Sequence, residues 1–304
     1  MTSGIDIHQH VWPPELVEAL RRRDSAPRLR GWTLVLDGQP DDSIAPADHD
    51  PAARAALVAA DGLERALVSL SSPLGIESLP ADESAELLAA YHDGALALPE
   101  PLGAWAAAGL AEVDAAGLER ELDRGFVGLQ LPATTLADAH GYERVRPLLE
   151  VLERRHRPLF VHPGPAAPAG AGPPARPAWW PAIVDYVGQM HAAWYAFRAL
   201  GRPRHPRLRA VFAMLAGLAP LHGERFAART GERTVVDEAA FLETSSYGPR
   251  AIDAIVRVTG VDVLVHGSDR PYAPPPESGL GPAADAALRV ANPHRLLDPS
   301  GGAR

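Results

Sequence analysis

The chain has 304 residues, of which 46% are hydrophobic, and its 29 basic and 38 acidic side chains give a formal charge of −9. This charge argues against a nucleic acid or an anionic membrane as partner, because both are bound through basic surfaces. The absence of cysteine excludes disulfides, thiolate metal sites and iron–sulfur clusters. All the basic residues are arginines, so Schiff bases and Walker-type phosphate lysines are excluded as well.

No targeting or membrane segment is recognisable in the sequence. The first ten residues lack the charged and apolar regions of a signal peptide. No uncharged apolar stretch reaches the ~18 residues that a membrane-spanning helix requires. We therefore expect a cytoplasmic protein that acts on a small-molecule substrate, and a homodimer is left open.

Short apolar runs of strand length alternate with stretches of helical periodicity along the whole chain, which predicts βαβ units and a parallel sheet. Eight such units in a chain of this length predict a (β/α)8 barrel that forms a single domain over residues 1–304. An open, doubly wound sheet is the alternative. The predicted strands are residues 5–8, 66–70, 102–107, 126–131, 159–162, 208–214, 240–244 and 261–265.

Two connections, residues 11–51 and 163–206, are too long to be simple turns. They follow the first and fifth predicted strands and therefore lie at the end of the barrel where active sites are built. We expect both to act as lid loops. Trp179 and Trp180 in the second loop are predicted to form an apolar wall against a ring or acyl substrate. Alternatively, they only pin the loop to the barrel rim.

Four polar residues fall at the ends of predicted strands. His8 and His10 close the first strand, His162 ends the fifth, and Asp269 follows the eighth. Residues two apart on a strand point to the same face, and the carboxyl ends of barrel strands meet at one mouth. An HxH pair alone is typical of buried, hydrogen-bonded histidines, but three imidazoles and one carboxylate form a suitable ligand set for one divalent ion. The sequence therefore predicts a metal site.

Five short motifs follow one another along the chain: IDIHQHVWPPEL, LERELDRGFVGLQLPA, PLFVHPGP, GSDRPYAPP and NPHRLL. Through these motifs the chain resembles the amidohydrolase-related family, which includes aminocarboxymuconate semialdehyde decarboxylase and related aromatic acid decarboxylases. The resemblance implies that His8, His10, His162 and Asp269 hold a single metal ion, usually zinc, with manganese as an alternative. It also implies that Asp269 is the catalytic residue that moves the proton. The absence of lysine agrees, because the two-metal branch of the superfamily commonly bridges its ions with a carboxylated lysine.

One position departs from the pattern of the family. The family ends its sixth strand with a histidine that activates the metal-bound water, and Met214 stands there in this chain. A thioether cannot accept that proton. Either Asp269 moves the proton alone, or another histidine such as His222 reaches in, or catalysis is impaired. We expect the side chain of Met214 to line the substrate pocket.

Arg270 and His266 flank Asp269. Arg270 is a candidate to bind a substrate carboxylate through two hydrogen bonds, or alternatively forms an ion pair at the rim. His266, three residues before Asp269, is expected to face the helix layer.

The leading interpretation is a metal-dependent hydrolase in which one ion activates water or orients a small carboxylic or acyl substrate. The first alternative is a non-oxidative decarboxylase of the same family. The second is a catalytically impaired homologue that binds a metal ion without turnover.

Overall fold

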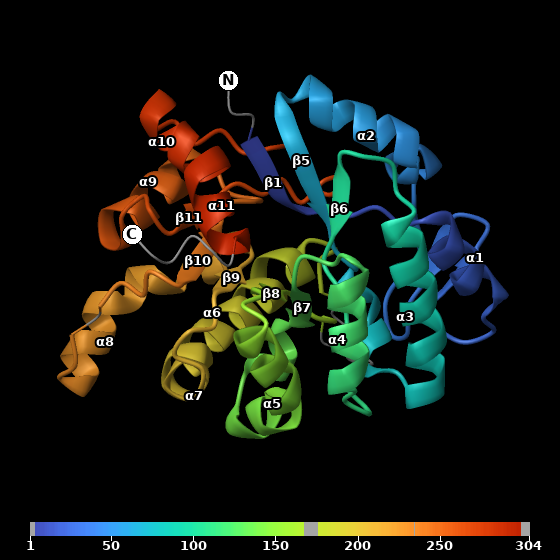
Figure 1. Ribbon diagram of the computed structural model, residues 1–304, viewed down its shortest axis with the longest axis horizontal. Helices are drawn as coiled ribbons and strands as arrows, with labels where there is room; N and C mark the ends of the chain where they lie inside the picture. Colours follow the sequence, from blue (N-terminus) through green and yellow to red (C-terminus); the bar gives the residue numbers. More distant parts are fainter. Residues whose placement is uncertain (1–3, 167–175, 234, 299–304) are drawn as a thin grey trace.

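The structure is a computed structural model and describes residues 4–166, 176–233 and 235–298. Eight parallel strands alternate with helices along the chain (Figure 1). The barrel strands are β1 (Gly4–Gln9), β5 (Leu63–Val68), β6 (Leu102–Ala104), β7 (Leu129–Pro132), β8 (Leu159–His162), β9 (Ala210–Phe212), β10 (Ala240–Glu243) and β11 (Leu264–Val265).

The strands form a closed barrel. They fall into the runs β1-β5-β6 and β7-β8-β9-β10-β11, and parallel bridges join these runs at both sides. One bridge pairs Ala106 with Leu129, and the other pairs Gln9 with Arg270. This closure confirms the predicted (β/α)8 barrel and excludes the open sheet. Each of the eight predicted strands is present, although several are shorter or shifted by a few residues.

The strands consist mainly of consecutive apolar residues because both of their faces are buried. Large aromatic side chains fill the barrel below its carboxyl end. The indole of Trp105 donates a hydrogen bond to the carbonyl of Ile7 at 2.9 Å, and its ring lies 5.3 Å from that of Phe160. Phe160 in turn packs edge-on against His8 at 5.0 Å. The packed interior thus forms the floor beneath the polar residues at the mouth.

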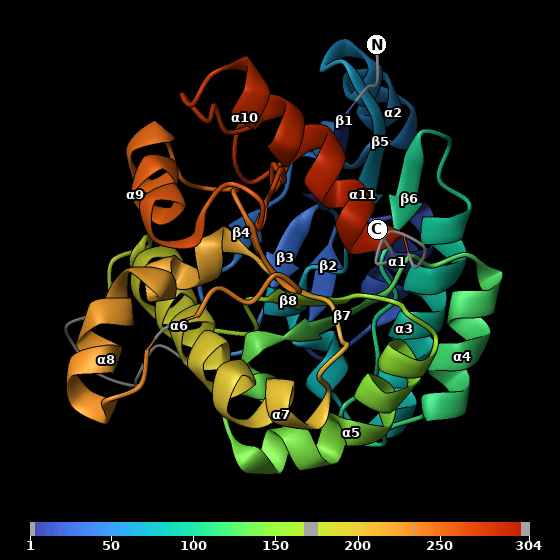
Figure 2. The same ribbon diagram turned by 60° about the vertical axis from the view of Figure 1, so that its left-hand side comes forward.

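Helices surround the barrel, and Figure 2 shows α3 to α6 enclosing one side. Three of them begin at an aspartate, at Asp50, Asp114 and Asp138, whose carboxylate accepts the backbone N–H three residues on. Among the described residues, no helix is both long and apolar enough to cross a membrane. The helices are α1 (Pro14–Arg22), α2 (Pro51–Ala60), α3 (Ala81–Leu96), α4 (Ala115–Arg124), α5 (Ala139–Arg154), α6 (Tyr186–Ala196), α7 (Arg202–Arg204), α8 (Gly223–Thr230), α9 (Pro249–Thr259), α10 (Pro282–Ala286) and α11 (Asn292–Leu297).

The long connection after β1 has a structure of its own. It contains α1 and a small antiparallel sheet made of β2 (Arg28–Arg30), β3 (Thr33–Val35) and β4 (Asp42–Ser43). In the register of this sheet, Leu34 on β3 lies opposite Asp42 on β4. Directly opposed residues share a face of the sheet, so these two side chains lie on the same side.

The long connection after β8 leads into a helix. Residues 167–175 lie outside the described residues, and the chain continues through a wide helical turn, η5 (Pro181–Asp185), directly into α6. Trp179 and Trp180 precede this turn and stack on one another, with ring centroids 5.8 Å apart.

Candidate metal centre and pocket

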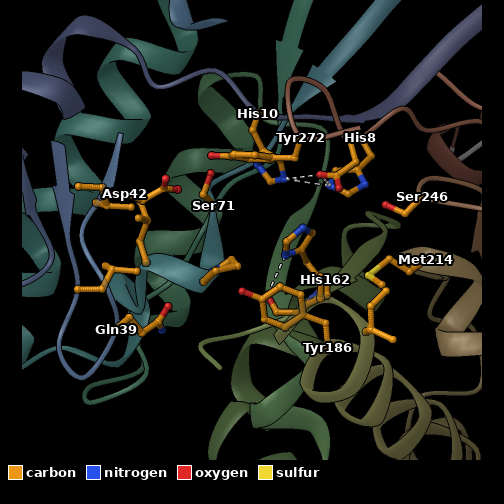
Figure 3. Close-up of a pocket in the computed structure, with 18 of the residues that line it drawn as sticks. His8, His10, Gln39, Asp42, Ser71, His162, Tyr186, Met214, Ser246 and Tyr272 are labelled. Carbon is orange, nitrogen blue, oxygen red and sulfur yellow. Dashed lines mark hydrogen bonds and ion pairs between the residues drawn. The ribbon is translucent and has the colours of Figure 1, made fainter. Parts of the chain in front are cut away.

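The structure brings the four predicted ligands together at the carboxyl end of the barrel. His8 and His10 come from β1, His162 ends β8, and Asp269 follows β11. One ligand atom of each residue lies within 4.8 Å of the others. The Nε2 atoms of His8 and His10 are 3.1 Å apart, and Asp269 Oδ1 lies 3.4 and 3.2 Å from them. Figure 3 shows the three imidazoles facing one another.

Each imidazole is held through its other ring nitrogen. Nδ1 of His10 lies 3.0 Å from the carbonyl of Ser69, and Nδ1 of His162 lies 2.8 Å from the carbonyl of Pro163. A carbonyl can only accept, so in both residues Nδ1 carries the proton and Nε2 presents a lone pair. Burial lowers the pKa of both imidazoles and so favours their neutral, ligating form. Lone pairs directed toward one another repel unless a cation lies between them, so the donor set fits a divalent ion.

Glu243, at the end of β10, holds the third imidazole and was not among the predicted site residues. Its Oε2 lies 3.1 Å from Nδ1 of His8. Although burial alone lowers the pKa of His8, the carboxylates of Asp269 and Glu243 raise it. Glu243 is fully buried and accepts hydrogen bonds from the backbone N–H and the hydroxyl of Ser245. The sequence does contain a signal for Glu243, because it is a polar residue at the end of an apolar strand. The same kind of position led to the prediction of His162.

Met214 lies beside the metal centre in an unusual backbone conformation. The five residues 214–218 all have positive φ, between 49° and 62°, and so form one left-handed turn. Left-handed backbone costs roughly 1–2 kcal/mol per residue that is not glycine. The turn is held because Glu243 Oε2 accepts the N–H of Met214 at 3.2 Å and Gly217 packs against the carbonyl of Val187 on α6. As a result, Met214 lines the pocket, where the sequence predicts it.

The pocket above the metal centre has a volume of about 420 Å³, which is within the range of small-molecule sites. The segments after β1 and after β8 both contribute to its walls. The lining is mainly apolar beyond the metal centre. It includes Trp12, Leu34, Leu36, Ile44, Pro73, Leu74, Ala182, Ile183, Tyr186, Val187, Met214, Tyr247 and Tyr272, with Gln39, Asp42, Ser71 and Ser246 as further polar members.

Trp179 and Trp180 do not line this pocket, so the predicted apolar wall needs correction. Trp179 is 55% exposed, and the wall on this side is formed by Ile183 and Tyr186. The two indoles stack on each other, and the guanidinium carbon of Arg176 lies 5.4 Å from the ring centroid of Trp180. The tryptophans therefore pack against their own segment and not against the pocket.

Arg270 also lies away from the pocket. Its guanidinium forms an ion pair with Asp61 at 3.0 Å. Of the two roles expected for Arg270, this is the ion pair at the rim and not the binding of a substrate carboxylate. Asp269 lines the pocket in a left-handed backbone conformation with a φ of 59°, and the chain turns at this residue so that Arg270 points to Asp61. His266 is buried against the helix layer near Leu288, as expected. His222 is exposed, and its ring contacts that of His191 instead of the metal centre.

The sequence profile of the amidohydrolase family matches residues 5–298. The chain belongs to the amidohydrolase family. This confirms the resemblance and the prediction of an enzyme of the amidohydrolase superfamily. None of the curated proteins compared with this amidohydrolase matches it in sequence.

Solved structures share the fold of this amidohydrolase over nearly its whole length. IDCase of Metarhizium anisopliae is 18% identical, with 97% of each chain covered and a TM-score of 0.79. The 5-carboxyvanillate decarboxylase LigW of Sphingomonas paucimobilis is 19% identical, with 98% of this chain and 99% of that chain covered and a TM-score of 0.72. A dihydroxybenzoic acid decarboxylase of a Polaromonas species, with bound manganese and the inhibitor 2-nitroresorcinol, is 16% identical, with 98% and 97% covered and a TM-score of 0.67.

Proposed function

We propose that this member of the amidohydrolase family is a metal-dependent, non-oxidative decarboxylase of small aromatic carboxylic acids. The observation that carries the proposal is Met214. It lines the pocket beside the metal centre, at the position where the resembled family has the histidine that activates the metal-bound water. A thioether accepts no proton, and decarboxylation needs no base at that position. The decarboxylase activities of structural relatives and the apolar pocket add support, so decarboxylation replaces hydrolysis as the leading interpretation.

The metal centre in this proposal consists of His8, His10, His162 and Asp269 holding one divalent ion. Zinc suits three imidazoles and one carboxylate, and the manganese bound to a structural relative makes Mn²⁺ an equal candidate. Such an ion would supply a positive centre that orients the carboxylate of the substrate. The remaining chemistry comes from the residues of the chain itself.

In this proposal Asp269 delivers the proton. The bond between the ring carbon and the carboxylate carbon breaks, CO₂ leaves, and its bonding electron pair stays on the ring carbon. That carbon takes the proton from the Asp269 carboxyl, which is reprotonated from water. Tyr186 lines the same pocket, and burial raises the pKa of its phenol to about 12, so it stays neutral beside the reacting ring. The apolar walls exclude water from the carbanion-like transition state.

The experiment is incubation of the zinc- and manganese-loaded protein with hydroxybenzoic acids in D₂O. We expect CO₂ release and one deuterium on the ring carbon that carried the carboxylate. The Asp269→Asn variant should lose at least ~10² of the rate, because it cannot deliver a proton. Cleavage of lactones or amides without release of CO₂ from any acid would overturn the proposal in favour of hydrolysis.

A further inference from the structure

Apart from the histidines of the metal centre, the pocket contains no basic side chain among the residues that the structure describes. Its carboxylates are those of Asp269 and Asp42. Arg270 is turned outward to Asp61. Arg54 is buried behind the metal centre, where it donates to the side chain of Gln9 and to the carbonyl of His10. No lysine exists in the chain. Away from the metal centre, therefore, no described residue of the pocket can neutralise an anionic group of a substrate.

Asp42 lies on the far side of the pocket from the metal centre. It comes from β4, where the register places its side chain on the same face as Leu34, and both residues line the pocket. In Figure 3, Asp42 and Gln39 lie at one end, Met214 and Ser246 lie at the other, and His10 and His162 lie between them. The small sheet after β1 thus brings one carboxylate to the end of the pocket that is remote from the reacting group.

The carboxylate of Asp42 has no hydrogen bond or ion pair within the described part of the chain. Its neighbours in the pocket are polar and uncharged. Gln39 offers an amide, and the hydroxyl of Ser71 already accepts a hydrogen bond from the indole of Trp12 at 3.0 Å. The same segment contributes the apolar side chains of Leu34, Leu36 and Ile44 to the walls of the pocket. Away from the metal centre, the pocket therefore combines mainly apolar walls with the carboxylate of Asp42.

We infer that Asp42 selects the substrate, by favouring aromatic monoacids whose end remote from the carboxylate carries a hydrogen-bond donor, above all an ammonium group. An apolar ring suits the walls, and a donor suits the unpaired carboxylate. A second carboxylate at that end is disfavoured, because it would face Asp42 with no cation beside it. The inference rests on the proposed function for the orientation of the substrate, with its carboxylate at the metal centre.

The test is calorimetric binding of four acids to the metal-loaded protein: benzoate, 4-methylbenzoate, 4-(aminomethyl)benzoate and terephthalate. Because Asp42 is exposed to solvent in the open pocket, a contact worth ~1 kcal/mol is reasonable. We therefore expect the ammonium compound to bind about fivefold more tightly than the methyl compound, and terephthalate to bind about fivefold more weakly. Both differences should shrink at high salt.

Two variants distinguish a direct contact between Asp42 and the ligand from a general effect of the protein's net charge. Asp42→Asn should reduce both preferences to less than twofold. Asp41→Asn removes the same charge from the adjacent residue, which does not line the pocket, and should leave both preferences in place. Equal effects of the two variants, or terephthalate binding as tightly as 4-methylbenzoate, would overturn the inference.

Benzoate binding keeps the two proposals distinguishable. Benzoate has no group that could reach Asp42, so its binding reports only the metal end. If benzoate binds when metal is present and is released by a chelator, and Asp42→Asn changes nothing, only the role of Asp42 fails. If benzoate binds neither with nor without metal, the proposed function fails, and the inference fails with it.

Discussion

Glu243 connects the metal centre to the left-handed turn through a single oxygen atom. Its Oε2 lies 3.1 Å from Nδ1 of His8 and accepts the backbone N–H of Met214 at 3.2 Å. The carboxylate therefore fixes the orientation of one imidazole and the start of the turn that places Met214 in the pocket. A group in this position increases the basicity of the imidazole it holds.

The first prediction concerns Glu243→Gln. Glutamine keeps the size of the side chain, but it replaces one of the two accepting oxygens with an NH₂ group, and His8 and Ser245 need acceptors. We expect metal affinity to fall about 10- to 100-fold. Metal titration with a fluorescent competitor measures the affinity, and circular dichroism checks the fold. Ser245→Ala, which removes only one donor, should cost much less; equal effects of the two variants would contradict the assigned role of Glu243.

The second prediction concerns stoichiometry. Elemental analysis should find one equivalent of metal per chain, because the described ligand set contains four donor atoms around one point. His162→Ala should lose the metal and keep the barrel folded, since His162 lies at the mouth. His222→Ala is the matched control, because that exposed histidine lies away from the cluster. Two tightly held equivalents, both lost in His162→Ala, would refute the single-ion site.

The third prediction concerns Met214→His. General-base assistance is typically worth ~10²–10⁴ in rate. If the native reaction is decarboxylation, this variant should release CO₂ no faster than the natural protein, while weak hydrolysis of aryl lactones should appear. Met214→Leu, which adds no base, should show no hydrolysis. A large increase in a hydrolytic activity already present in the natural protein would instead indicate an impaired hydrolase.

The fourth prediction concerns the left-handed turn. A methyl group on Gly217 would lie 2.5 Å from the carbonyl oxygen of Val187, so α6 would have to move. We expect Gly217→Ala to lower the free energy of unfolding by ~2–4 kcal/mol, which combines strain at positive φ with overpacking. Gly231→Ala is the control, since Gly231 has φ of +75° with open space around it; it should cost only ~1–2 kcal/mol. Urea unfolding measures both, and equal costs would show that the contact with α6 adds nothing.

The fifth prediction concerns the pH dependence of stability. Burial raises the pKa of Glu77 from its ordinary value of 4.5 to about 7, and its carboxyl accepts a hydrogen bond from Ser72. Between these two pKa values the folded chain binds more protons than the unfolded chain. The contribution of Glu77 to stability is therefore fully present below about pH 4.5 and is lost as the pH rises toward about 7.

Glu77→Gln tests this dependence, because the amide is neutral at every pH. Across that interval we expect the natural protein to lose up to ~3 kcal/mol relative to the variant. Urea unfolding at pH 5 and pH 8 supplies the comparison. A stability difference between the two proteins that does not change with pH would show that Glu77 titrates normally.

The sequence by itself determined the barrel and singled out the four residues of the candidate metal centre. Buried parallel strands are apolar on both faces, so they stand out as continuous runs, and His8, His10, His162 and Asp269 mark where those runs end. In a closed barrel all such ends converge, so strand order alone brings the four side chains together. Glu243 also ends a barrel strand. It was not predicted as a site residue because it lies in no recognised motif.

Tertiary structure alone decided which side chains face the pocket outside the strands. In regular strands, alternation fixes the direction of each residue, but loops have no such period. In the segment after β8, Ile183 and Tyr186 line the pocket while Trp179 and Trp180 stack on each other outside it. In the segment after β1, the pairing of β3 with β4 places Asp42 at the far end of the pocket. The left-handed turn at Met214 has no pattern in the sequence, because it exists only where Glu243 and α6 hold it. These contacts join residues far apart in the chain, and a local pattern contains no information about them.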